Sequence, residues 1–179
     1  MGRFLVAILA GIVGAGVVHI AVLLLVPTYS ERDAWSMLAE RSNYYIATRL
    51  DPAGQLPLIP TLDPLFNAIA CRFDLDEGVL HLHGDGDVPY WSVSVYDRSG
   101  QNIFSVNDQS NPTEGLDFVV ATPRQMVELR NDLPMDFDGS VFIEADMGEG
   151  IVVVRAFTPD ESWEDIVSSY LQGLTCTLR

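Results

Sequence analysis

The sequence contains no lysine: all ten of its basic residues are arginine, against 25 aspartate and glutamate residues. Arg3 is the one charged residue before position 27, so the rest of the chain carries 9 arginines and 25 acids, a net charge of −16. Such a surface repels phosphate backbones and offers no polybasic patch to anionic lipid headgroups. We therefore expect no nucleic-acid partner.

Cysteine is also scarce, because Cys71 and Cys176 are the full complement. They lie too far apart in the sequence for a zinc or redox motif, which needs closely spaced thiols. In an oxidising compartment the pair would form a disulfide that closes a loop of about a hundred residues. Two separate buried thiols are the alternative. We favour the disulfide on the condition that the domain is exported.

Formal charge is absent from residues 4–26, which are interrupted only by His19. As a helix this segment would span about 34 Å, enough to cross a bilayer core of about 30 Å. A cleaved signal peptide is the alternative. Its apolar core would be only about 7–15 residues long, with small residues at its end. Here the small residues lie in the first half and an apolar run (22–26) follows them. This order favours a retained membrane anchor.

Four residues of this segment share one helix face at a spacing of four: Ala7, Gly11, Ala15 and His19. Small side chains let a second membrane helix approach closely, so we interpret this face as a transmembrane packing seam. An imidazole on the seam would contact the partner helix. Proton or ion handling, and simple placement near the headgroups, are the alternatives for His19.

The flanks of the segment indicate its orientation. Arg3 and the terminal amine precede it, whereas the acidic sequence Glu31-Arg32-Asp33 follows. A short basic head with a long tail predicts a cytoplasmic N-terminus and a periplasmic C-terminal domain, anchored in a bacterial inner membrane.

We divide the chain into a transmembrane anchor (1–29), a helix with a proline-rich connector (30–64) and a β-rich exported domain (65–179). Ser30 can cap a helix that runs to about Arg49, and five prolines or glycines between positions 51 and 64 indicate an irregular segment. Asp63-Pro64 is predicted to start a helical turn through Ile69.

Alternation of apolar and polar residues predicts strands at 71–75, 79–83, 90–96, 103–106 and 117–121. A turn at 97–100 joins two of them in a hairpin, and residues 140–146 and 151–158 are predicted to form a second hairpin. Thr122, Pro123 and Gln125 form a helix start, for a helix to about Asn131. Another helix is predicted at 160–171, and an edge strand at the end of the chain. The inward-facing residues of the 160–171 helix would be Trp163, Ile166, Val167 and Tyr170. The fold class is thus α+β: one N-terminal transmembrane helix, then an antiparallel β-rich domain with a few short helices.

Three stretches carry a resemblance to a known family: Cys71-Arg72-Phe73-Asp74-Leu75, Tyr90 to Asp97 running on to Asn107-Asp108, and Val154-Arg155-Ala156-Phe157. With the histidine-containing anchor, they resemble the short alphaproteobacterial membrane proteins of domain-of-unknown-function family 1254. The Trp-Ser-x-x-x-Tyr-Asp hairpin is similar to the sister family 1214, and genes of the two families are often neighbours. The resemblance implies a β-rich exported domain and a second small membrane protein as partner. It implies no reaction, so no catalytic residue is assigned.

Two clusters are candidate sites. His81 and His83 share one strand face and could ligate zinc with Asp85, although a solvent-facing strand followed by a Gly-Asp turn explains the same residues. A candidate ligand pocket comprises the aromatic and polar residues Trp91, Tyr96, Asn107, Asp108 and Arg155.

The leading functional hypothesis is a non-catalytic, single-pass inner-membrane subunit that assembles with a partner membrane protein. The second is an anchored periplasmic binding module for a small carbohydrate or lipid, and the third is a metal-dependent hydrolase around His81 and His83. We expect no cofactor, and the sequence leans against an enzyme.

Overall fold

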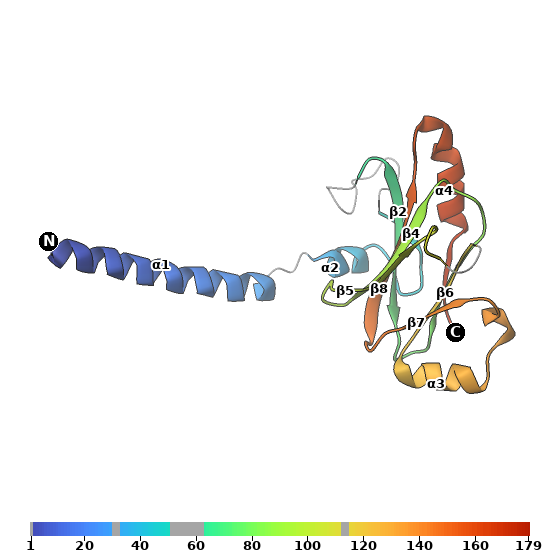
Figure 1. Cartoon of the computed structure of the whole chain (residues 1–179), viewed down its shortest axis with the longest axis horizontal. Coiled ribbons are helices and arrows are strands. Elements are labelled where there is room, and N and C mark those ends of the chain that lie inside the picture. Colours follow the sequence, from blue (N-terminus) through green and yellow to red (C-terminus); the bar gives the residue numbers. More distant parts are fainter. Residues whose placement is uncertain (1, 30–32, 51–62, 112–114) are drawn as a thin grey trace.

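The computed structural model describes residues 2–29, 33–50, 63–111 and 115–179, and side chains within the first range up to residue 25. It has a long N-terminal helix, α1 (Gly2–Tyr29), and a β-rich domain that lies apart from it (Figure 1). Helix α1 continues through Pro27, beyond the uncharged segment of residues 4–26. The predicted α+β class is confirmed.

The domain is built from two sheets. The first has the order β1-β2-β8-β4-β5 and the second the order β7-β6-β3-β9. The strands of the first sheet are β1 (Thr48–Arg49), β2 (Phe66–Asp74), β4 (Trp91–Asp97), β5 (Asn102–Asn107) and β8 (Glu149–Phe157). Those of the second are β3 (Leu80–Gly84), β6 (Leu116–Ala121), β7 (Val141–Glu144) and β9 (Thr175–Leu178). All pairs are antiparallel except β6 with β7.

The main core lies between the sheets because alternate residues of each strand point inward. Val93 and Val95 of β4, Leu80 and Leu82 of β3, and Phe118 of β6 are all fully or almost fully buried in one cluster. The helix α4 (Glu164–Gly173) adds buried side chains to this cluster, after a short 3₁₀ turn η2 (Glu161–Trp163). The disulfide between Cys71 and Cys176 links β2 to β9, so it joins the two sheets covalently.

Smaller apolar clusters cover the outer faces of both sheets. Helix α2 (Ala34–Ala39) places Trp35 and Leu38 on the outer face of β2, where Ala68 and Ala70 lie. The helix α3 (Pro123–Asn131) and the 3₁₀ turn η1 (Met135–Phe137) cover the outer face of the second sheet around Val119. In Figure 1, α3 and α4 lie at opposite ends of the domain.

Several predicted elements were wrong. The helix predicted from Ser30 to Arg49 is confined to α2, which Asp33 caps, because Tyr45 adopts a positive φ of 59° and β1 pairs with β2. The helical turn predicted through Ile69 is strand β2, whose whole length pairs with β8. The proline-rich connector lies mostly at 51–62, outside the described residues.

The second predicted hairpin does not form, since β7 pairs in parallel with β6 and β8 belongs to the other sheet. Ile166 is 47% exposed, whereas Val167 and Tyr170 are buried as predicted. The α3 helix, with its capping box between Thr122 and Gln125, and the edge strand β9 are confirmed.

Candidate functional site

Helix α1 presents its apolar surface outward. Residues Gly2–Leu25 have a mean hydropathy of 2.6, and none of this window is buried. The exposed fraction of its large apolar side chains ranges from 45% at Ile8 to 74% at Phe4. A Cβ atom added at Gly11 would meet no heavy atom within 4 Å. The predicted seam of Ala7, Gly11, Ala15 and His19 is therefore open to a second helix.

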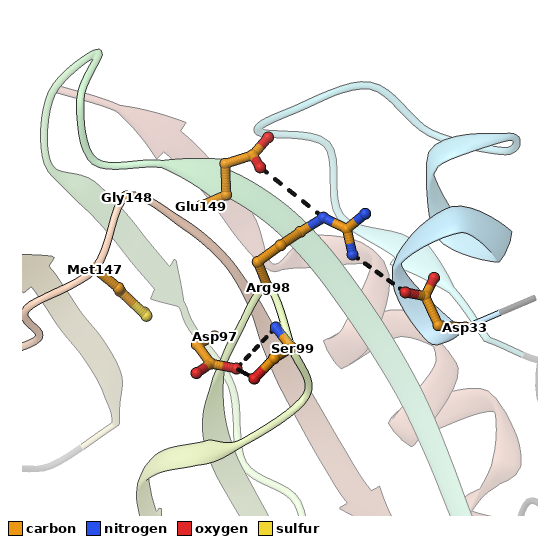
Figure 2. A pocket seen from close by; sticks show the side chains of 7 residues that line it. All are labelled: Asp33, Asp97, Arg98, Ser99, Met147, Gly148 and Glu149. Atoms are coloured by element: carbon orange, nitrogen blue, oxygen red, sulfur yellow. Dashed lines mark hydrogen bonds and ion pairs between the residues drawn. The ribbon is translucent and has the colours of Figure 1, made fainter. Parts of the chain in front are cut away.

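A pocket lies where the first helix after the apolar segment meets the β-domain (Figure 2). It has a volume of about 730 Å³, and the residues that line it are Asp33, Asp97, Arg98, Ser99, Met147, Gly148 and Glu149. We call it the Arg98 pocket. The Arg98 guanidinium reaches from Asp33 (Nη1 to Oδ2, 3.2 Å) to Glu149 (Nε to Oε2, 3.9 Å). Sequence reasoning missed this pocket because its residues come from three distant segments.

Beside the pocket, two arginines flank one tryptophan. The guanidinium of Arg98 lies 4.6 Å from the Trp35 ring centroid and that of Arg72 lies 5.2 Å away. Arg72 also covers the Tyr44 ring at 4.5 Å, and Tyr44 donates a hydrogen bond to Glu149. These cation–π contacts attach α2 to the first sheet.

Two acids of the Arg98 pocket, Asp33 and Asp97, have lowered pKa values that favour their ionised form. The Ser36 backbone N–H donates a hydrogen bond to the Asp33 carboxylate, and this bond lowers the pKa of Asp33. Arg98 lowers that pKa further. The Ser99 hydroxyl, with nearby backbone N–H groups, likewise lowers the pKa of Asp97. General acid catalysis needs a carboxyl whose pKa is raised toward neutrality. Asp33 and Asp97 act instead as structural acceptors in a helix cap and a turn.

The candidate ligand-pocket residues lie on two faces of the first sheet. Trp91 is 7% exposed and points into the core, where its ring centroid is 6.0 Å from that of Phe118. Asn107 and Arg155 both pair with Ser92 on the outer face. Arg155 lies over the Phe66 ring at 4.6 Å. Tyr96 lies on the same outer face, further along β4. Asp108 follows β5, and its backbone N–H donates a hydrogen bond to the Trp91 carbonyl oxygen. The five residues therefore do not converge on one cavity.

His81 and His83 lie together on the outer face of β3, as their spacing predicts. His81 Nε2 is 3.0 Å from Asp117 Oδ1, and His83 Nδ1 is 3.4 Å from Asp117 Oδ2. The expectation of a solvent-facing strand was wrong for His81, which is 8% exposed because Phe137 of η1 lies against its ring. Asp85 is 3.5 Å from the other nitrogen of His83.

Sequence reasoning missed Asp117 as a partner of the histidines. Its polar position within the apolar alternation of 116–121 was visible, but the pairing of β6 with β3 was not. The register places Asp117 directly opposite His83.

The fold and these sites together define a class of protein: an apolar N-terminal helix followed by a disulfide-linked, two-sheet α+β domain. A family model described as "Protein of unknown function (DUF1254)" matches residues 43–177. The chain belongs to this family, as the resemblance of its strands indicated. The match covers the β-rich domain and not α1.

One solved structure shows the same fold at low sequence identity, and a second aligns more loosely. The VPA0106 protein from Vibrio parahaemolyticus aligns with a TM-score of 0.55 and 13% identity, over 66% of this chain and 29% of its own. An uncharacterised protein from Burkholderia cenocepacia aligns with a TM-score of 0.46 and 16% identity, over 73% of this chain and 34% of its own. This chain thus spans about a third of the length of either protein. No curated protein matches the sequence significantly.

Proposed function

We propose that the protein is a non-catalytic, single-pass subunit of the bacterial inner membrane, with a cytoplasmic N-terminus and a periplasmic β-rich domain. The observation that carries this proposal is the unburied apolar helix of residues Gly2–Leu25. An apolar surface of this size needs a cover in water, and a bilayer supplies one over the whole length of the helix.

The disulfide supports the periplasmic location. Bonds of this kind persist in oxidising compartments and are rare in the cytosol. Cys71 and Cys176 are both buried, and they are the only cysteines of the chain. Their pairing therefore needs an oxidising environment while the domain folds.

The seam supports a helical partner. In lipid, helices associate through close packing of small residues and through polar contacts between helices. Ala7, Gly11 and Ala15 offer the close approach, and His19 offers a hydrogen-bonding group that costs less free energy against a partner than against lipid. A second small membrane protein, such as a member of the sister family, would fit this surface.

Native mass spectrometry of the tagged full-length chain, purified from its own membrane in mild detergent, tests the proposal. We expect a stoichiometric second membrane protein. A lone chain that carries only a small-molecule adduct would contradict the subunit and favour an anchored binding module instead.

Matched glycine variants test the seam. Gly11→Ile should abolish association because the added side chain keeps the partner helix away. Gly16→Ile is the control, since Gly16 lies about 140° around the helix from Gly11 and also has open space around it. Equal complex formation by both variants would rule out the seam.

A further inference from the structure

We propose that His81, His83 and Asp117 form a binding site for a divalent transition-metal ion, with zinc as the best match. One ligand atom from each residue can be chosen so that all three lie within 4.8 Å of one another. Two imidazoles and one carboxylate form a donor set that zinc accepts at bond lengths of about 2.0–2.2 Å. This site is independent of the anchor and the seam.

Both imidazoles face the Asp117 carboxylate at distances close to those between the ligand atoms of a tetrahedral ion. In a tetrahedral site with bonds of that length, any two ligand atoms lie roughly 3.3–3.6 Å apart. His81 Nε2 lies 3.0 Å from Asp117 Oδ1 and His83 Nδ1 lies 3.4 Å from Asp117 Oδ2, so each imidazole faces its own oxygen of the carboxylate. Because one donor atom from each of the three residues lies within 4.8 Å of the other two, side-chain adjustment would bring all three onto one ion. Two sheet strands hold the donors, because His81 and His83 are two residues apart on β3 and Asp117 is opposite on β6.

One donor atom has no other role. His83 Nδ1 is buried and forms no hydrogen bond among the described residues, although it lies beside Asp117. Burial of a nitrogen without a hydrogen-bond partner is unfavourable because the atom loses its hydrogen bonds to water. Coordination of a metal ion by its lone pair would remove this cost.

Neighbouring groups orient the donors as they do in established metal sites. The Ser140 hydroxyl donates to Asp117 Oδ1 at 2.6 Å, and Asp85 Oδ2 lies 3.5 Å from His83 Nε2. A carboxylate on the outer nitrogen of a histidine fixes the tautomer that ligates through the inner nitrogen. Phe137, 2% exposed, closes the site beside His81, with ring centroids 5.1 Å apart. Three protein ligands leave one position for water or a further ligand.

Zinc titration of the full-length protein in detergent, stripped of metal beforehand, tests the site by isothermal titration calorimetry. We expect one zinc ion per chain. His83→Ala and Asp117→Asn should each weaken binding by at least roughly a hundredfold, and Asp85→Asn by about 10–100-fold. His19→Ala is the matched control, because it removes the one histidine outside the site and should leave the affinity unchanged.

Two further results separate ligand loss from misfolding. His83 is the more exposed histidine of the pair, so His83→Ala should keep the disulfide and the wild-type circular dichroism spectrum. Cobalt in place of zinc should give the visible absorption of a tetrahedral site in the wild type and lose it in His83→Ala. Absence of stoichiometric zinc, or zinc binding that survives both His83→Ala and Asp117→Asn, would overturn the proposal.

Discussion

At the scale of single residues, the two cysteines have the largest expected effect on stability. The disulfide joins positions 105 residues apart, and a loop of that size corresponds to about 4–5 kcal/mol in the chain-entropy model. We expect the double variant Cys71→Ser/Cys176→Ser to lose stability of that order in urea unfolding at neutral pH. The addition of a reductant should destabilise the wild type and leave the double variant unchanged. If the reductant destabilised both proteins equally, the result would contradict the presence of the disulfide.

Tyr44 gives a prediction in alkaline solution. Its hydrogen bond to Glu149, with some desolvation, raises the pKa of Tyr44 from 10.0 to about 12. The folded protein therefore holds this proton more tightly than the unfolded chain does. The stabilisation should be complete below pH 10 and disappear as the pH rises through about 12.

The measurement is the unfolding free energy of the wild type and of Tyr44→Phe across this pH range. The difference between the two proteins cancels the contribution of the other tyrosines. We expect the advantage of the wild type to shrink between pH 10 and 12, and parallel profiles would contradict the assignment.

The metal ligands show how far single residues can be read from the sequence. The spacing of His81 and His83 was enough to place them on one strand face. Asp117 was identified only when the sheet register was known, because its partner strand lies more than thirty residues away. The Arg98 pocket was missed for the same reason. Contacts between distant segments leave no local pattern.

At the scale of elements, strand β8 has one position, Gly150, where the packing leaves no room for a side chain. It pairs with Phe73 on one side of β8 and with Asp97 on the other. An added Cβ atom would lie 2.5 Å from Phe73 Cζ and 2.8 Å from the Tyr96 carbonyl oxygen. The backbone oxygen cannot move away cheaply, so Gly150→Ala should cost about 1–3 kcal/mol.

Gly173→Ala is the matched control. Gly173 ends α4, and an added Cβ would meet no heavy atom within 4 Å. Alanine is the better helix former by about 1 kcal/mol in a helix interior, so this variant should be neutral or slightly more stable. The order of the two variants in thermal unfolding checks the prediction, and a Gly150→Ala protein as stable as Gly173→Ala would contradict it.

Elements with a strong local signal were predictable. The capping box of Thr122 and Gln125 located α3 to the residue, and the strict alternation at 90–96 located β4 to within one residue at each end. Other elements were wrong because tertiary pairing overrides local preference. The first half of strand β2 (66–70) lies under α2, where Ala68 and Ala70 are buried on the outer face, so it lacks the alternation that predicted the second half at 71–75. The parallel pairing of β7 with β6 was also not predictable, because parallel strands are not joined by a tight turn that marks the pair in the sequence.

At the scale of the whole molecule, the prediction concerns which part of the chain persists. A retained anchor requires that the mature protein keep α1, whereas removal of a signal peptide would shorten it. Intact mass spectrometry of protein isolated from native membranes should give the full 19.7 kDa chain, less two hydrogens for the disulfide. A shorter product that begins near position 27 would contradict the anchor.

The link between β2 and β9 also sets how the molecule bears mechanical load. A pulling force between α1 and the C-terminal residues would enter the domain through the segment before Cys71 and cross directly to Cys176 through the sulfur–sulfur bond. The chain between these two cysteines, which includes both histidines and most of the core, carries no tension along that path. The load can thus detach only the parts outside the two cysteines, which are α2, β1, the first residues of β2 and the end of β9, and the strands between the cysteines stay assembled while the bond is intact.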